Sequence, residues 1–169
     1  MCKMAIENGS NILKQEGNII VVYGNILNAE EHIICHQVNC KGVMNAALAK
    51  QIRDKWKQVY LEYMGLFTEN TSGLLGSSQL VPVGNAKYVA NLFGQYNYGR
   101  NPLMCYTNYR ALKNAFVNVK QFAIINNYSV AIPYGIGCGL ANGDWEKVYK
   151  IILDVFLDSG VNVTLYKLD

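Results

Sequence analysis

The chain has 169 residues, enough for one domain, and its net charge of +3 comes from lysines and arginines scattered along it. Apolar residues make up 51% and charged residues 16%, which excludes a disordered or fibrous chain, and no run of like charges marks a nucleic-acid arm. The first residues lack a secretory signal and no window reaches the ~18 apolar residues of a membrane span, so we expect a cytoplasmic protein with no membrane partner.

The first half of the chain predicts two buried strands, a helix and a hairpin. Residues 18–23 and 32–38 are β-branched runs typical of the interior of a parallel sheet. Apolar residues recur at steps of three and four over residues 48–63, which predicts one amphipathic helix. Residues 79–83 and 87–93 flank a Gly-Asn-Ala turn, which indicates a hairpin, and a proline places its first strand near a sheet edge.

The second half predicts two more helices, each followed by a strand. One helix spans about residues 108–127, and a strand follows at residues 129–134. After a glycine-rich loop, Asp144 is a good N-cap for an amphipathic helix that Gly160 is expected to stop. Residues 161–168 then form a closing strand.

This alternation of strands and helices predicts an α/β fold, with a mixed sheet covered by helices on both faces. We assign residues 18–169 to the domain and residues 1–17 to an N-terminal extension that adds a short strand or hairpin around residues 8–9. The five cysteines form no C-x-x-C pair and lie mostly in apolar segments. We therefore expect reduced thiols and no metal or cofactor.

The strongest local signal is the run PYGIGCGLANGDW over residues 133–145, between a predicted strand and a helix. Four glycines in nine residues cost backbone entropy. Glycines let the main chain approach a ligand, and its N–H groups with the following helix N-terminus suit a diphosphate. An ordinary tight connection is the alternative interpretation. For Asp144, the alternatives are a structural cap and a catalytic base.

A second signal is the run HQVNCKGVM over residues 36–44, where a buried strand delivers polar side chains to its end. Ligands of open α/β sheets lie beyond such strand ends. One of His36 and Asn39 can act as acid, base or nucleophile while the other holds a hydroxyl. A satisfied interior histidine is the alternative for His36. Lys41 is positioned to lower the pKa of the Cys40 thiol.

Together with Gly-Asn-Ile-Leu at residues 24–27, these motifs resemble the successive landmarks of the macrodomain family, from about residue 18 to the end of the chain. The resemblance implies a three-layer α/β/α fold with a central mixed, mostly parallel sheet. It is strongest to the branch that contains yeast-type ADP-ribose 1″-phosphate phosphatases and terminal ADP-ribose glycohydrolases. The implied ligand is ADP-ribose or a derivative.

The resemblance also implies roles for individual residues. Residues after the first strand hold adenine, the loop after the second strand surrounds the distal ribose, and the glycine-rich loop wraps the diphosphate. His36 and Asn39 match the His-x-x-Asn-Cys run of the phosphatase branch, whose histidine is considered catalytic, and Asp144 completes the candidate catalytic set. The candidate ligand-binding residues are Asn25, Ile26, Asn39, Val43, Asn45, Gly135, Ile136, Gly137, Cys138, Gly139 and Leu140.

Three positions depart from the family pattern. Asn25 stands where most macrodomains have aspartate, and an asparagine loses the charge-assisted bond to an adenine amino group. Asn-Ala-Ala at residues 45–47 replaces a Gly-x-Gly step, so the methyl of Ala47 is expected to narrow the distal-ribose pocket. Gln95 or a neighbouring residue stands where the glycohydrolase branch has a lysine, and Ala141 stands where it has an aspartate, so we expect no lysine adduct.

Three functions remain open at this point. The chain hydrolyses a 1″-linked group, phosphate or ester, from ADP-ribose derivatives. Alternatively, it is a non-catalytic reader of ADP-ribose, of a related signalling nucleotide, or of ADP-ribosylated protein or nucleic acid. In the third case it is an interaction surface without a ligand. Tyr96, Tyr98 and Arg100 could then stack on and pair with nucleic acid, although the chain has no basic stripe to follow a nucleic-acid backbone.

Overall fold

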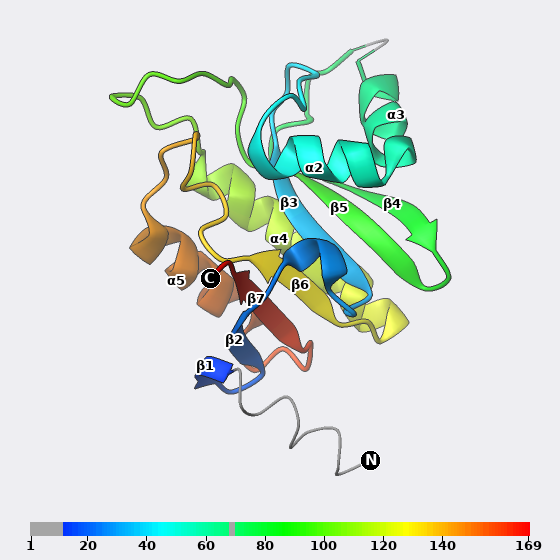
Figure 1. Ribbon diagram of the computed structural model, residues 1–169, viewed down its shortest axis with the longest axis vertical. Helices are drawn as coiled ribbons and strands as arrows, with labels where there is room; N and C mark the ends of the chain where they lie inside the picture. The colour runs from blue at the N-terminus through cyan, green and yellow to red at the C-terminus, as the bar shows by residue number, and fades with distance from the viewer. Residues whose placement is uncertain (1–11, 68–69) are drawn as a thin grey trace.

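A computed structural model of the chain describes residues 12–67 and 70–169, which contain one seven-stranded sheet (Figure 1). The strands are β1 (Ile12–Glu16), β2 (Ile19–Tyr23), β3 (Ile33–Val38), β4 (Ser78–Gly84), β5 (Lys87–Phe93), β6 (Val130–Pro133) and β7 (Val163–Lys167). The helices are the 3-10 helix η2 (Ile26–Asn28), α2 (Ala47–Lys55), α3 (Lys57–Gly65), α4 (Tyr109–Asn126) and α5 (Trp145–Phe156).

The sheet is mixed and mostly parallel, as the sequence predicts. Its strand order is β1-β2-β7-β6-β3-β5-β4. The five strands from β2 to β5 in this order pair in parallel, while the edge strands β1 and β4 pair antiparallel to their neighbours. All the inner strands therefore end at the same edge of the sheet.

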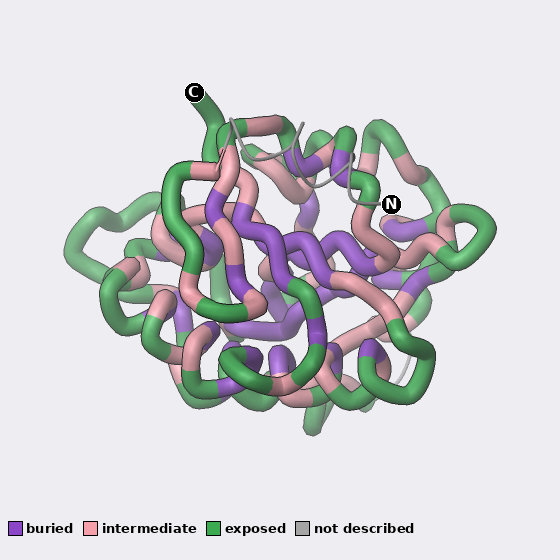
Figure 2. Tube along the Cα trace, turned by 90° about the horizontal axis from the view of Figure 1, so that it is seen from below, coloured by how far each residue is buried: buried purple, intermediate pink, exposed green. Residues whose placement is uncertain are grey.

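Helices cover both faces of the sheet, which gives the predicted three layers (Figure 1). On one face, Leu112 and Phe116 of α4 and Phe156 of α5 belong to a buried apolar cluster with the strands. On the other face, Ile52 of α2 and Tyr63 of α3 belong to a second cluster. Figure 2 shows the buried trace running through the middle of the molecule, with exposed loops around it.

Local signals place most of the elements correctly. The hairpin of β4 and β5 has Ala86 at φ +50° in its turn, and Pro82 lies on the edge strand β4. Asn108 caps α4 by accepting a hydrogen bond from the Ala111 amide at 3.0 Å. Asp144 caps α5 by accepting one from the Glu146 amide at 3.0 Å. The predicted cap at Asp144 is therefore confirmed, as is the predicted start of a helix at Asn108.

Two helix boundaries differ from the expectation. The single helix predicted over residues 48–63 is wrong, because Trp56 has φ −128° and ψ +83° and separates α2 from α3. Apolar periodicity does not distinguish one helix from two consecutive ones whose buried faces stay in phase. Helix α5 ends at Phe156 rather than at Gly160, because the chain is already extended at Leu157.

The strand β1 lies within the segment assigned to the N-terminal extension, and it forms an antiparallel pair with β2. Residues 8–9, where we expect a strand or hairpin, lie outside the described residues. The boundary at residue 18 stays a prediction. Across residues 12–67 and 70–169, none of the helices has the length and apolarity that crossing a bilayer requires.

Candidate functional site

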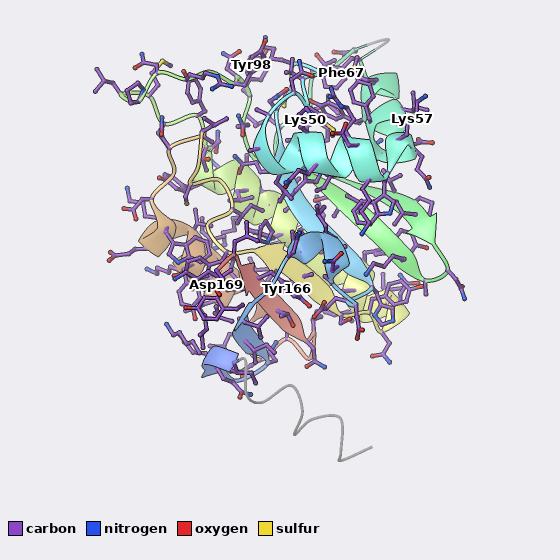
Figure 3. The ribbon with its side chains drawn as sticks, in the orientation of Figure 1. Lys50, Lys57, Phe67, Tyr98, Tyr166 and Asp169 are labelled. Atoms are coloured by element: carbon purple, nitrogen blue, oxygen red, sulfur yellow. The ribbon has the colours of Figure 1, made fainter. Side chains whose placement is uncertain are left out.

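A cavity of about 1160 Å³ lies beyond the carboxyl ends of the parallel strands. Its wall is built from the segments that follow β2, β3, β5 and β6 and from the end of β7. Figure 3 shows Tyr98, on the loop after β5, and Tyr166, on β7, well apart, and both line the cavity. This is the edge at which open α/β sheets bind their ligands.

The charges on the cavity wall suit an anionic ligand. Among the described residues, the wall contains the cations Arg100 and Lys167 and no carboxylate. Arg100 is exposed and has no hydrogen-bond or ion-pair partner among the described residues, and Lys167 lies over the Tyr134 ring, 4.9 Å from its centroid. In the same part of the chain, no cluster of three or more His, Cys, Asp or Glu side chains could hold a metal ion.

The glycine-rich loop after β6 has a closed side and an open side. Gly135 and Gly137 have φ values of +82° and +75°, which favour glycine. The Gly137 carbonyl accepts hydrogen bonds from the Gly143 amide at 2.8 Å and the Thr107 hydroxyl at 2.6 Å. A Cβ on Gly143 would lie 2.5 Å from that carbonyl oxygen, whereas one on Gly135 or Gly139 would meet nothing within 4 Å. The loop is thus fixed on the side of the Gly137 carbonyl, and the side of Gly135 and Gly139 has free space.

The loop after β5 holds the glycine-rich loop in place. The Tyr106 amide donates to the Ala141 carbonyl at 2.8 Å. Asn142, at φ +59°, donates its side-chain amide to the carbonyls of Asn101 at 3.0 Å and Met104 at 2.8 Å. The two loops therefore form one hydrogen-bonded unit on this side of the cavity.

Gln37 extends this unit to the end of β3, and the sequence carries no signal that singles it out. Its Nε2 donates to Gln95 Oε1 at 2.9 Å and to Thr107 Oγ1 at 3.0 Å. Its Oε1 is buried and has no partner among the described residues. Gln37 and Gln95 both line the cavity, and their hydrogen bond ties the loop after β5 to β3.

His36 lines the cavity but is only 2% exposed. It lies beside Asn91 of β5 in the sheet register, and its Nε2 is 2.5 Å from Asn91 Oδ1. Burial lowers the pKa of His36 to about 4, so the imidazole is neutral at neutral pH. Its Nδ1 is buried without a partner among the described residues.

Asn39 also lines the cavity, but its side chain mainly shapes the loop after β3. Its Oδ1 accepts hydrogen bonds from the amides of Lys41 at 3.0 Å and Val43 at 3.3 Å and from the Tyr63 hydroxyl at 2.9 Å. Its Nδ2 donates to the Val43 carbonyl at 2.8 Å, which leaves one amide hydrogen. Next to it, burial raises the pKa of the Cys40 thiol more than Lys41 lowers it, so the net shift is opposite to the lowering that Lys41 alone would give.

The remaining candidates at the ribose and adenine ends line the cavity. They are Asn25, Ile26, Val43 and Asn45. Asn25 Oδ1 accepts from the Leu27 amide at 3.0 Å and so caps η2. Asn45 Oδ1 accepts from the Arg53 guanidinium at 2.7 Å. Both side-chain oxygens thus already have partners, and their amide nitrogens are the groups left for a ligand.

Two candidates in the glycine-rich loop do not reach the cavity wall, whereas Gly135, Ile136, Gly137, Gly139 and Leu140 do. Cys138 packs against the apolar cluster under α4 and α5, and burial raises the pKa of its thiol to about 11. The Asp144 carboxylate caps α5 by accepting a hydrogen bond from the Glu146 amide, and Asp144 does not line the cavity. The structure therefore does not bring Asp144 together with His36.

The buried His36 makes stability depend on pH. Its pKa falls from 6.5 to about 4 on folding, so in this window the unfolded state binds a proton that the folded state does not, and stability falls as pH falls. Between about pH 7.5 and about pH 4.5, we expect the wild type to lose about 2 to 3 kcal/mol more than His36→Gln. Urea unfolding of both proteins measures this, and parallel pH profiles would contradict it.

Ala47 begins α2 at φ +48°, a conformation that favours glycine, and its methyl lies at the cavity wall. Ala47→Gly is expected to raise the free energy of unfolding by about 1 kcal/mol. If the methyl narrows the pocket, as the sequence predicts, the substitution also tightens the binding of ADP-ribose, the ligand that the family resemblance implies. Ala49→Gly, within the same helix and cavity wall, is the matched control and should lower stability by about 1 kcal/mol. Thermal unfolding and ligand titration check both, and equal effects of the two substitutions would be inconsistent with backbone strain at Ala47.

Comparisons with known proteins agree with this architecture. No protein-family model and no curated protein matches the chain. A solved protein of unknown function from Bacteroides thetaiotaomicron is 29% identical at a TM-score of 0.80, over 91% of this chain and 100% of that one. A macrodomain protein from Streptomyces coelicolor is 26% identical at a TM-score of 0.72, over 88% and 97%.

Thermosipho africanus DarTG, solved in complex with ADP-ribose, aligns at a TM-score of 0.77 and 17% identity, over 92% of this chain and 43% of that one. At this identity the likeness concerns the fold alone. Together with the seven-stranded mixed sheet and its two helical layers, these similarities show that the chain has the macrodomain fold.

Proposed function

We propose that this chain binds ADP-ribose or a derivative in the cavity, with its diphosphate against the glycine-rich loop. The observation that carries the proposal is the glycine-rich loop. Hydrogen bonds from Gly143 and Thr107 fix its Gly137 carbonyl, while the space beside Gly135 and Gly139 is unoccupied by protein atoms. Main-chain N–H groups in such turns, next to a helix N-terminus, form sites for anions. Within residues 12–67 and 70–169, the cavity wall has two cations and no carboxylate, which suits the same ligand.

Size and fold give further support. At about 1160 Å³ the cavity exceeds the range of roughly 300–1000 Å³ typical of small-molecule sites, so it has room for a ligand with two riboses and a base. Thermosipho africanus DarTG, part of which shares this fold, was solved in complex with ADP-ribose. In the proposed pose, Asn25 and Ile26 contact adenine, and Asn39, Val43 and Asn45 surround the distal ribose.

His36 favours a second function, the hydrolysis of a 1″-linked phosphate or ester. It lines the cavity, is neutral at neutral pH and keeps one ring nitrogen without a partner among the described residues. For a phosphate, a water oxygen bonds to phosphorus while its proton passes to His36. The bond from phosphorus to the 1″ oxygen breaks, that oxygen takes the proton from His36, and the loop amides offset the developing negative charge.

Calorimetry with ADP-ribose tests the first proposal, because an absence of heat at high ligand concentration would overturn it. A turnover screen of ADP-ribose 1″-phosphate and of protein- and nucleic-acid-linked ADP-ribose tests the second. Binding without any product would leave a non-catalytic reader of ADP-ribose. Binding with product from one of these compounds would identify the group that the enzyme removes.

A further inference from the structure

Three polar side chains form a row across the sheet inside an otherwise apolar layer. His36 of β3 lies beside Asn91 of β5, and Asn91 lies beside Gln79 of the edge strand β4. Their neighbours on the same face, two residues away along each strand, belong to the apolar cluster under α2 and α3: Ile34, Val38, Val81, Val89 and Phe93. His36 and Asn91 are buried and Gln79 is half-buried, and polar groups buried in such a layer are unfavourable unless they are hydrogen-bonded.

The hydrogen bonds of this row have one direction. Gln79 Nε2 donates to the Glu62 carbonyl at 3.0 Å, which can only accept, so Gln79 Oε1 faces Asn91. Asn91 Nδ2 donates to that Oε1 at 3.0 Å, so Asn91 Oδ1 faces His36. An amide oxygen can only accept, and Nε2 of His36 is 2.5 Å from it. Nε2 must therefore carry the ring proton.

The position of that proton decides what His36 can do. A neutral imidazole carries one proton, so with Nε2 protonated the lone pair is on Nδ1. Nδ1 is buried without a partner among the described residues, and His36 lines the cavity. In the other tautomer, two acceptors would face each other at 2.5 Å and an Nδ1–H group would have no acceptor.

We propose that Asn91 and Gln79 are positioning residues that hold His36 as the Nε2–H tautomer and so keep its Nδ1 lone pair free to accept a proton. The inference rests on the hydrolytic function proposed above. A row that served stability alone would not need histidine at its end, because a glutamine at position 36 also offers an amide donor to Asn91. Histidine adds a neutral nitrogen base.

The tautomer can be observed without any substrate. The sequence contains two histidines, so a two-bond ¹H–¹⁵N spectrum of the labelled protein holds the imidazole signals of His32 and His36 alone, and His36→Gln assigns them. At neutral pH we expect His36 to show a protonated Nε2 and an unprotonated Nδ1. A protonated Nδ1, or a mixture of the two tautomers, would overturn the proposal.

Variants of the row test its direction. Asn91→Leu removes the acceptor for His36, and Gln79→Met frees the Asn91 amide to turn, so both variants should show a mixture of His36 tautomers. Asn91→Asp keeps an acceptor and should therefore keep the Nε2–H tautomer. Gln58→Met is the matched control, since Gln58 also donates to a carbonyl, that of Pro82, outside the row. An unchanged tautomer in Gln79→Met would refute the role of Gln79 even if Asn91→Leu does not fold.

Activity gives an independent readout of the same variants. In Gln79→Met we expect kcat for the 1″-linked substrate to fall by about tenfold or more, while the affinity for ADP-ribose stays unchanged. Gln58→Met should keep the wild-type kcat. If the wild type binds ADP-ribose but turns over no substrate, the hydrolytic function fails, and the tautomer measurement still decides whether the row sets the ring proton.

Discussion

Gly137→Val is expected to weaken ADP-ribose binding by about tenfold to a hundredfold, because about 1–3 kcal/mol of backbone strain enters the glycine-rich loop. Gly137 has φ +75°, where a β-branched residue is strongly disfavoured. Its Cβ would lie 3.0 Å from Gln37 Oε1 and 3.0 Å from Thr107 Oγ1. The Thr107 hydroxyl also donates to the Gly137 carbonyl, so a valine side chain at this position would displace the loop. Calorimetry measures the loss.

Gly160→Val is the matched control for this substitution. Gly160 has φ +83°, but a Cβ there would meet nothing within 4 Å, and Gly160 does not line the cavity. It should therefore destabilise the fold through the same backbone strain while ADP-ribose binds as in the wild type. If both variants bind ADP-ribose as tightly as the wild type, the diphosphate does not lie against this loop.

The predictable parts of the molecule are those that depend on neighbours in the sequence. The β-branched runs of β2 and β3 and the caps at Asn108 and Asp144 lie within a few residues of the elements that they specify. The glycine-rich loop is recognisable for the same reason, since Gly137 needs positive φ and Gly143 leaves no room for a Cβ. These requirements are visible in the residue types themselves.

The supporting residues of the site could not be predicted, because their partners are distant in sequence. Gln37 meets Thr107 only after β3 and the loop after β5 are in place. Likewise, Asn91 meets His36 through the strand register, which no local pattern specifies. Asp144 shows the opposite problem: its position before a helix suits both a cap and a base, and only the structure places its carboxylate on the Glu146 amide.

His36→Gln is expected to reduce turnover of a 1″-linked substrate by about 10²- to 10⁴-fold while ADP-ribose still binds, because the variant lacks the nitrogen base. Glutamine keeps an amide donor for Asn91, so the row of polar side chains can persist and the loss reports on proton transfer. His32→Gln is the control, since His32 Nδ1 already accepts from the Ser129 amide at 3.0 Å at the start of β3. Turnover in His36→Gln equal to that of His32→Gln would exclude His36 as the base.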